Sequence, residues 1–165
     1  MSSRPSSLVS LAAVALVAGS FTFTPALAVV PGSASATNTD DKGLGLQGYD
    51  AVAYFTDGKP QKGSPRFKIK HDGVTYYFAS AAHLREFKAN PDAYLPQFGG
   101  FCAMGTANGH KFEGDPNVWR IVDQKLYLNN NPDVGKRWSQ DIAGNISRAV
   151  DNWPQIKDKT PKELE

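Results

Sequence analysis

The chain has 165 residues, 41% of them hydrophobic and 21% charged, and its formal net charge at pH 7 is +2. This length and composition predict a single globular domain and exclude a fibrous or wholly disordered chain. The small net charge gives no support to binding of nucleic acid or of an anionic membrane surface. The single cysteine, Cys102, excludes a disulfide within the chain, so its thiol is expected to be buried, metal-binding, reactive or bridged to another chain.

The N-terminal residues have the pattern of an export signal. Arg4 precedes residues 8–18, an apolar run that is too short to cross a bilayer, and small-residue cleavage patterns end at Ala28 and at Ala36. We therefore expect residues 1–28 to be a signal peptide, with cleavage after one of these two alanines. The protein is then periplasmic or secreted and keeps no segment inserted in the membrane.

The rest of the sequence predicts one α+β domain between two polar ends. Residues 29–43 predict a disordered linker, and residues 154–165 predict a flexible tail. In residues 44–153 strand patterns, turn residues and helix caps alternate. The predicted strands are residues 51–55, 66–70, 74–78, 118–122 and 125–128, and the predicted helices are residues 81–89, 101–107 and 132–153. We expect a small antiparallel sheet of two hairpins, packed by a short central helix and a long C-terminal helix.

Several local signals fix the ends of these elements. Ser80 is a helix N-cap, and Gly99-Gly100 permits a tight bend before Cys102. Asp72-Gly73 is a typical hairpin turn, whereas Asp123-Gln124 lacks the glycine, which predicts a different turn type. We find no internal repeat and no phosphate-binding loop in the sequence.

One run of these residues resembles the YHS domain family. The family's core pattern is an aromatic hairpin ending in Tyr-Phe-x-Ser, a short helix ending in Phe, and Pro-x-x-Tyr. The matching residues here are Tyr77, Phe78, Ser80, Phe87, Pro91 and Tyr94. Residues 48–55 and 99–103 resemble the exported, stand-alone bacterial members, and the resemblance covers residues 44–153. Because YHS domains often occur fused to metal transporters or oxygenases, the resemblance implies an accessory role.

The resemblance also implies metal binding. In the metal-handling relatives this segment is Tyr-Phe-Cys-Ser-x-x-Cys, and both cysteines are implicated in binding the metal; here Ala79 and His83 stand at those positions. Imidazole, thiolate and thioether donors together favour copper(I) or zinc over hard cations. We therefore predict a soft transition-metal site, for copper or zinc, with Cys102, His83, Met104 and His110 as ligands in that order of preference.

Two other functions stay open at this point. The chain has many aromatic residues, and an exposed group of them would mark a protein partner of a metal-free module whose cysteine is structural. Alternatively, Cys102 at the start of the helix 101–107 is a redox nucleophile with His83 or His110 as its base. No Cys/His catalytic motif supports the enzyme, so we assign no catalytic residue. Asp50 is expected to cap a turn.

Overall fold

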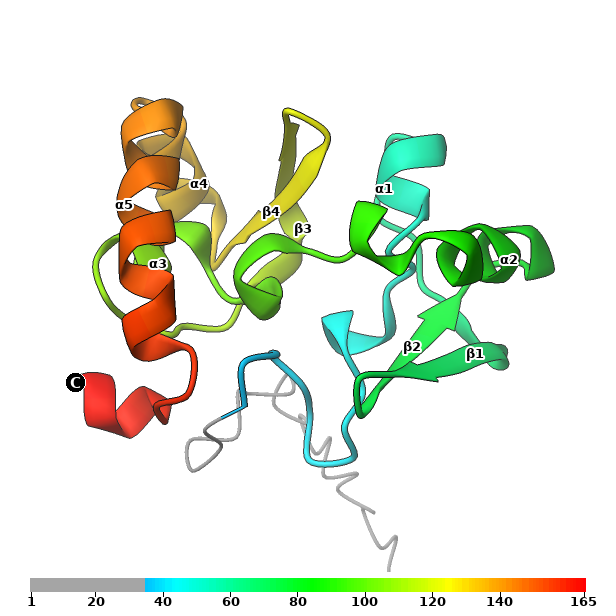
Figure 1. Cartoon of the computed structure of the whole chain (residues 1–165). Helices are drawn as coiled ribbons and strands as arrows, with labels where there is room; N and C mark the ends of the chain where they lie inside the picture. Colours follow the sequence, from blue (N-terminus) through cyan, green and yellow to red (C-terminus); the bar gives the residue numbers. More distant parts are fainter. Residues whose placement is uncertain (1–34) are drawn as a thin grey trace, which may run out of the picture.

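The computed structural model describes residues 35–165, so the predicted signal peptide and the start of the predicted linker lie outside the described residues. The predicted α+β class is confirmed (Figure 1). Strand β1 (Ser64–His71) pairs antiparallel with β2 (Val74–Phe78), and β3 (Asp115–Val122) pairs antiparallel with β4 (Lys125–Asn129). The two predicted hairpins therefore form two separate small sheets.

Helices cover both sheets. The α-helices are α1 (Ala53–Thr56), α2 (Ala81–Ala89), α3 (Ala103–Ala107), α4 (Pro132–Trp138) and α5 (Ile142–Ile156). Short 3-10 helices lie at Leu46–Gly48 (η1), Pro91–Ala93 (η2), Gln97–Gly100 (η3) and Pro161–Leu164 (η4). Within residues 35–165, every helix is too short or too polar to cross a bilayer.

The structure contains an internal repeat. Residues 44–89, the first repeat, run through η1, α1, β1, β2 and α2, and residues 96–138, the second repeat, run through η3, α3, β3, β4 and α4. The interval along the chain from β1 to β3 equals the interval from β2 to β4. The equivalent strands of the two repeats also have equal lengths, β1 and β3 with 8 residues each and β2 and β4 with 5 residues each. Both hairpins also shift register at the same place in their first strand. The expectation of no internal repeat is therefore wrong.

The repeat extends to the hairpin turns. Asp72 and Gly73 have φ angles of 46° and 82°, and Asp123 and Gln124 have φ angles of 49° and 57°. Both turns thus have two residues in the left-handed region, as tight hairpins require. The predicted difference in turn type is wrong, because Gln124 adopts the conformation that glycine adopts more easily.

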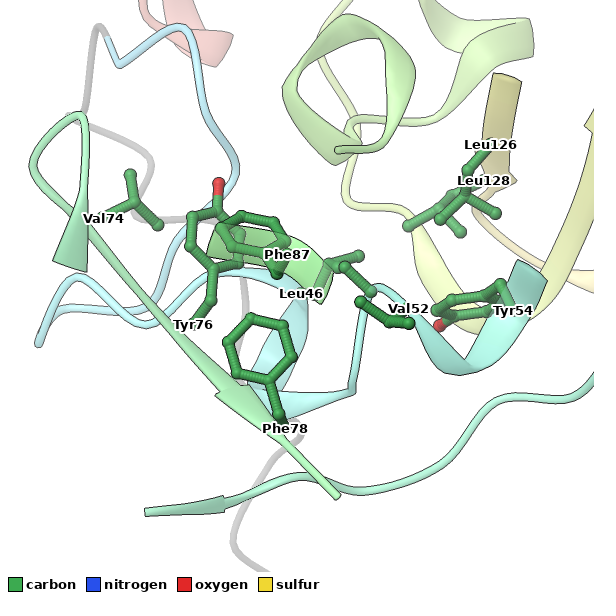
Figure 2. Packing of buried hydrophobic residues seen from close by; sticks show 10 residues of the cluster. Leu46, Val52, Tyr54, Val74, Tyr76, Phe78, Phe87, Leu126 and Leu128 are labelled. Carbon is green, nitrogen blue, oxygen red and sulfur yellow. The ribbon is translucent and has the colours of Figure 1, made fainter. Parts of the chain in front are cut away.

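The larger hydrophobic core lies between the two repeats. Tyr76 and Phe78 of β2 pack on Phe87 of α2, with ring centroids 5.4 and 5.0 Å apart, and all three side chains are buried. Leu126 and Leu128 of β4 belong to the same buried cluster (Figure 2). The second hairpin therefore packs one face against the first repeat.

A second core lies on the other face of β4. Because successive residues of a strand point to opposite faces, Tyr127 points away from Leu126 and Leu128. It packs on Trp138 of α4, with ring centroids 5.6 Å apart, and Ala149 of α5 belongs to the same cluster. The β3–β4 hairpin is thus the layer shared by both cores.

Three predicted elements are wrong in detail. Residues 51–55 form no strand, because Val52 and Ala53 enter helix α1 next to the capping side chain of Asp50. The single helix predicted for residues 132–153 is two helices, since Asp141 caps a new helix by accepting a hydrogen bond from Gly144 N at 3.0 Å. Pro154 lies inside α5 and does not end it.

Both ends of the described chain are hydrogen-bonded to the domain, where the sequence predicts a disordered linker and a flexible tail. Asn38 N donates to Gly99 O at 2.8 Å. The buried Lys111 Nζ donates to three backbone oxygens, at 2.8 Å from Ser35 O, 3.0 Å from Lys157 O and 2.7 Å from Lys159 O. One ammonium group therefore joins the N-terminal segment to the chain that follows α5.

Candidate functional site

Asp50 and Cys102 occupy equivalent positions in the two repeats. Each lies two residues after a glycine with positive φ, Gly48 at 76° and Gly100 at 81°. The backbone N–H of each donates a 2.8 Å hydrogen bond across the repeat, from Asp50 to Gln61 O and from Cys102 to Phe112 O. Each side chain then stands at the start of a short helix, α1 or α3. The fold therefore gives a carboxylate and a thiol similar backbone surroundings.

In the first repeat, the fully buried Asp50 carboxylate is surrounded by donors. Oδ1 accepts from Val52 N at 2.9 Å and from Ala53 N at 3.4 Å, and Oδ2 accepts from Ala79 N at 2.7 Å. The capping role predicted for Asp50 is confirmed. Oδ2 also lies 2.7 Å from His83 Nδ1.

The contact with Asp50 orients the His83 ring. A histidine that gives its Nδ1 proton to a carboxylate keeps the lone pair on Nε2. Nε2 lies 3.4 Å from Thr56 Oγ1 and 3.8 Å from Asp57 Oδ2, and the side chain is 13% exposed. His83 therefore joins helix α2 to helix α1. The Asp50–His83 pair is not predictable from local sequence patterns, because the two residues are 33 positions apart along the chain.

In the second repeat, the Cys102 thiol lies among the equivalent donors. Its Sγ accepts from Gly105 N at 3.4 Å, and the S–H points to Asn129 Oδ1 at 3.7 Å. Burial raises the pKa of the Cys102 thiol, and the backbone N–H groups of Gly105, Asn130 and Met104 act in the opposite direction. As predicted, Cys102 stands at the start of a short helix.

Cys102 also lines a cavity of about 300 Å³ between α3 and α4. Met104 lines the same cavity, so a thiol and a thioether are available within it. The remaining wall is both polar and apolar, and it includes Phe112, Asn130, Val134 and Arg137.

The structure separates the four predicted metal ligands into groups. Cys102 and Met104 share the cavity, whereas His83 is bound to Asp50 in the first repeat. Figure 1 shows α2, which carries His83, and α3, which follows Cys102, on opposite sides of the molecule. His110 contacts Leu164 O through Nδ1 at 2.5 Å, and its ring stacks on Phe112 with centroids 5.6 Å apart. His110 thus contacts a residue of the cavity wall but is not itself among the residues that line the cavity.

No cluster of three or more His, Cys, Asp or Glu side chains within residues 35–165 could hold a metal ion. A soft-metal site at Cys102 would therefore depend on sulfur donors, since Met104 supplies the second sulfur among the described residues that line its cavity. This arrangement fits an ion of low coordination number and does not supply the four ligands of a structural zinc site.

Comparisons of the chain with protein-family models, with curated proteins and with solved structures found no match. The resemblance to the YHS domain thus stays a prediction from the residues quoted for it.

Proposed function

We propose that the protein is an exported YHS-type domain that binds one copper(I) ion through Cys102 and Met104. The observation that carries this proposal is that both sulfur-bearing residues line the same cavity of about 300 Å³. Thiolate and thioether are soft ligands, and soft ligands select copper(I) among the common biological cations.

The backbone around Cys102 supports a metal-bound thiolate. A thiol must lose its proton to bind a metal ion, and the resulting anion is stabilised by nearby N–H donors. Gly105 N donates to Sγ at 3.4 Å, and the backbone N–H groups of Asn130 and Met104 also act to lower the pKa of the thiol. The equivalent groups of the first repeat, those of Ala53, Ala79 and Val52, surround the Asp50 carboxylate. These N–H groups therefore offset part of the penalty that burial places on a Cys102 thiolate.

Copper is the better candidate of the two predicted ions. Zinc sites in proteins are almost always four-coordinate, with nitrogen, sulfur or carboxylate ligands. His83 belongs to a different cluster, and His110 is turned towards Leu164 O. Neither histidine is needed for a site with two sulfur ligands.

The main alternative is a metal-free interaction module, because Cys102 is only 1% exposed and can serve as a packed cap for α3. Burial, which raises its pKa, also makes the thiol a poor nucleophile at neutral pH, which weighs against the redox enzyme.

A titration distinguishes these functions. The purified, reduced protein would be titrated with copper(I) in competition with a chromophoric copper(I) chelator, and separately with zinc. We expect one equivalent of copper(I) to bind. Cys102→Ser should abolish this binding, and Met104→Leu should weaken it by about tenfold or more, because the thioether is lost while the apolar volume is kept.

The matched controls are His83→Gln and His110→Gln, which we expect to leave copper(I) affinity unchanged. Equal weak binding by all variants and the wild type would refute the site and favour the metal-free module. Loss of binding in His83→Gln but not in Met104→Leu would refute the proposed ligand pair.

A further inference from the structure

A surface cleft of about 420 Å³ lies between β3, β4 and α4 in the second repeat. Its walls include Val118 and Arg120 of β3, Asn129 of β4, and Gly135, Lys136 and Trp138 of α4. This volume is in the range of small-molecule sites, which usually combine an apolar wall with a few polar groups.

In the first repeat, large apolar side chains stand at the positions equivalent to the wall of this cleft. Phe67 and Ile69 of β1 and Leu84 of α2 pack against the buried cluster that contains Phe78 and Phe87. Phe67, Ile69 and Leu84 are equivalent to Val118, Arg120 and Gly135 of the second repeat. Phe78 and Phe87 are equivalent to Asn129 and Trp138. The cleft therefore arises from the loss of apolar volume between the same two elements.

Trp138 gives an independent indication of a missing partner. It occupies the position of Phe87, is 1% exposed, and packs on Tyr127. Its Nε1 is the buried side-chain donor that has no hydrogen-bond partner within residues 35–165. A buried N–H without an acceptor costs free energy, and the residue that carries this one is among those that line the cleft.

The charge of the cleft indicates the kind of ligand. Its described wall contains Arg120 and Lys136 and no carboxylate. Lys136 Nζ lies 3.6 Å from Asp133 Oδ1, but both side chains are largely exposed, so this ion pair is weak and can be exchanged. An anion at the mouth of the cleft would gain charge-assisted hydrogen bonds from the Arg120 guanidinium.

We propose that this cleft binds a small organic carboxylate with an apolar body. The apolar body takes the place that Phe67 and Leu84 fill in the first repeat, and the carboxylate pairs with Arg120 and Lys136. This second site is separate from the proposed copper ligands, and it does not depend on the proposed function.

The test uses phenylacetate as the probe and its uncharged amide, phenylacetamide, as the matched control ligand. Binding would be followed by the indole N–H resonance of Trp138 in a nitrogen–proton correlation spectrum, assigned with Trp138→Phe. We expect phenylacetate to shift this resonance saturably at millimolar concentrations, and phenylacetamide to bind about tenfold more weakly or worse because it lacks the charge.

Two variants locate the ligand. Val118→Phe installs the residue of the first repeat, fills the cleft, and should abolish the shift. Arg120→Gln changes an exposed residue, so it should leave the fold intact. It should weaken phenylacetate binding by about tenfold without affecting phenylacetamide. Lys70→Gln, which removes an exposed charge from β1, is the control and should change neither.

The proposal is overturned if phenylacetate produces no saturable shift of the Trp138 resonance, or if acid and amide bind equally. It is also overturned if a folded Val118→Phe protein and Arg120→Gln both bind phenylacetate as the wild type does. Binding of an acidic peptide but not of phenylacetate would assign the cleft to a protein partner and reject the small ligand.

Discussion

Removal of the Asp50 carboxylate should be among the most damaging single changes to this fold. The side chain is fully buried and accepts hydrogen bonds from Val52 N, Ala53 N and Ala79 N. It also lies 2.7 Å from His83 Nδ1. In Asp50→Ala these donors lose their acceptor inside the protein, where each unpaired group costs about 1–3 kcal/mol.

The expected loss is smaller than the simple sum, because water and local shifts satisfy some of the donors. We expect Asp50→Ala to lower the free energy of unfolding by about 3–5 kcal/mol, because several buried donors lose the same acceptor. Asp50→Asn keeps the volume and the oxygen that accepts from Val52 N and Ala53 N. It should therefore cost less, about 1–3 kcal/mol, because an amide nitrogen then faces Ala79 N.

Urea unfolding followed by circular dichroism measures these differences from the shift in midpoint. The control is Asp57→Asn, since the Asp57 side chain is 33% exposed and lies 3.8 Å from His83 Nε2. It should cost less than about 1 kcal/mol. If Asp50→Ala costs no more than Asp57→Asn, the buried carboxylate does not hold α1, α2 and the end of β2 together as described.

Three further changes test other parts of the structure. Lys111→Met removes the ammonium group that donates to Ser35 O, Lys157 O and Lys159 O. We expect the free energy of unfolding to fall by about 1–3 kcal/mol and proteolysis near the C-terminus to become faster. An unchanged rate of proteolysis would show that Lys111 does not hold the two ends of the described chain together. Burial and then the charge of Asp115 raise the pKa of Glu113 above 4.5. The protonated Glu113 carboxyl therefore stabilises the folded state below pH 4.5, and this stabilisation is lost as the pH rises through the folded-state pKa. The unfolding free energy of Glu113→Gln should rise relative to that of the wild type between pH 4 and 7, and a difference between the two proteins that does not change with pH would disprove this. Gln124→Gly relieves a φ of 57° and should raise the unfolding free energy by about 0.5–1 kcal/mol, and a destabilised hairpin would show that the glutamine side chain has a packing role.

Features that depend on neighbouring residues were predictable from the sequence. Ser80 was expected to cap the central helix, and its Oγ accepts from His83 N at 3.1 Å. The start of a short helix at Cys102 was predicted for the same reason, since the bend and the helix signals lie within a few residues of it. The structure of the apolar residues 51–55 was not predictable in this way, because a short apolar run fits a strand or a buried helix equally well.

The internal repeat was hidden because the two copies share geometry and few residues. The residues that the copies do share mostly shape the backbone at bends and turns: Gly48 and Gly100, Ala51 and Ala103, Gly58 and Gly109, Gly63 and Gly114, Pro65 and Pro116, Asp72 and Asp123, and Tyr76 and Tyr127. At the position where the first copy has Asp50, the second has Cys102. Residues of such different chemistry give no alignment signal, although the same backbone surrounds both.

The sequence by itself determined the α+β class, the two hairpins and the position of the single thiol at the start of a helix, because these follow from local periodicity and short-range hydrogen bonds. Only the tertiary structure decided which of the candidate ligands meet. Cys102 and Met104 face one cavity because they are two residues apart at one bend, whereas His83 packs against Asp50 in the other repeat. The physical reason is that the separation of two residues along the sequence does not specify which faces of β4 and of the flanking helices become buried. The burial of those faces determines where each side chain lies.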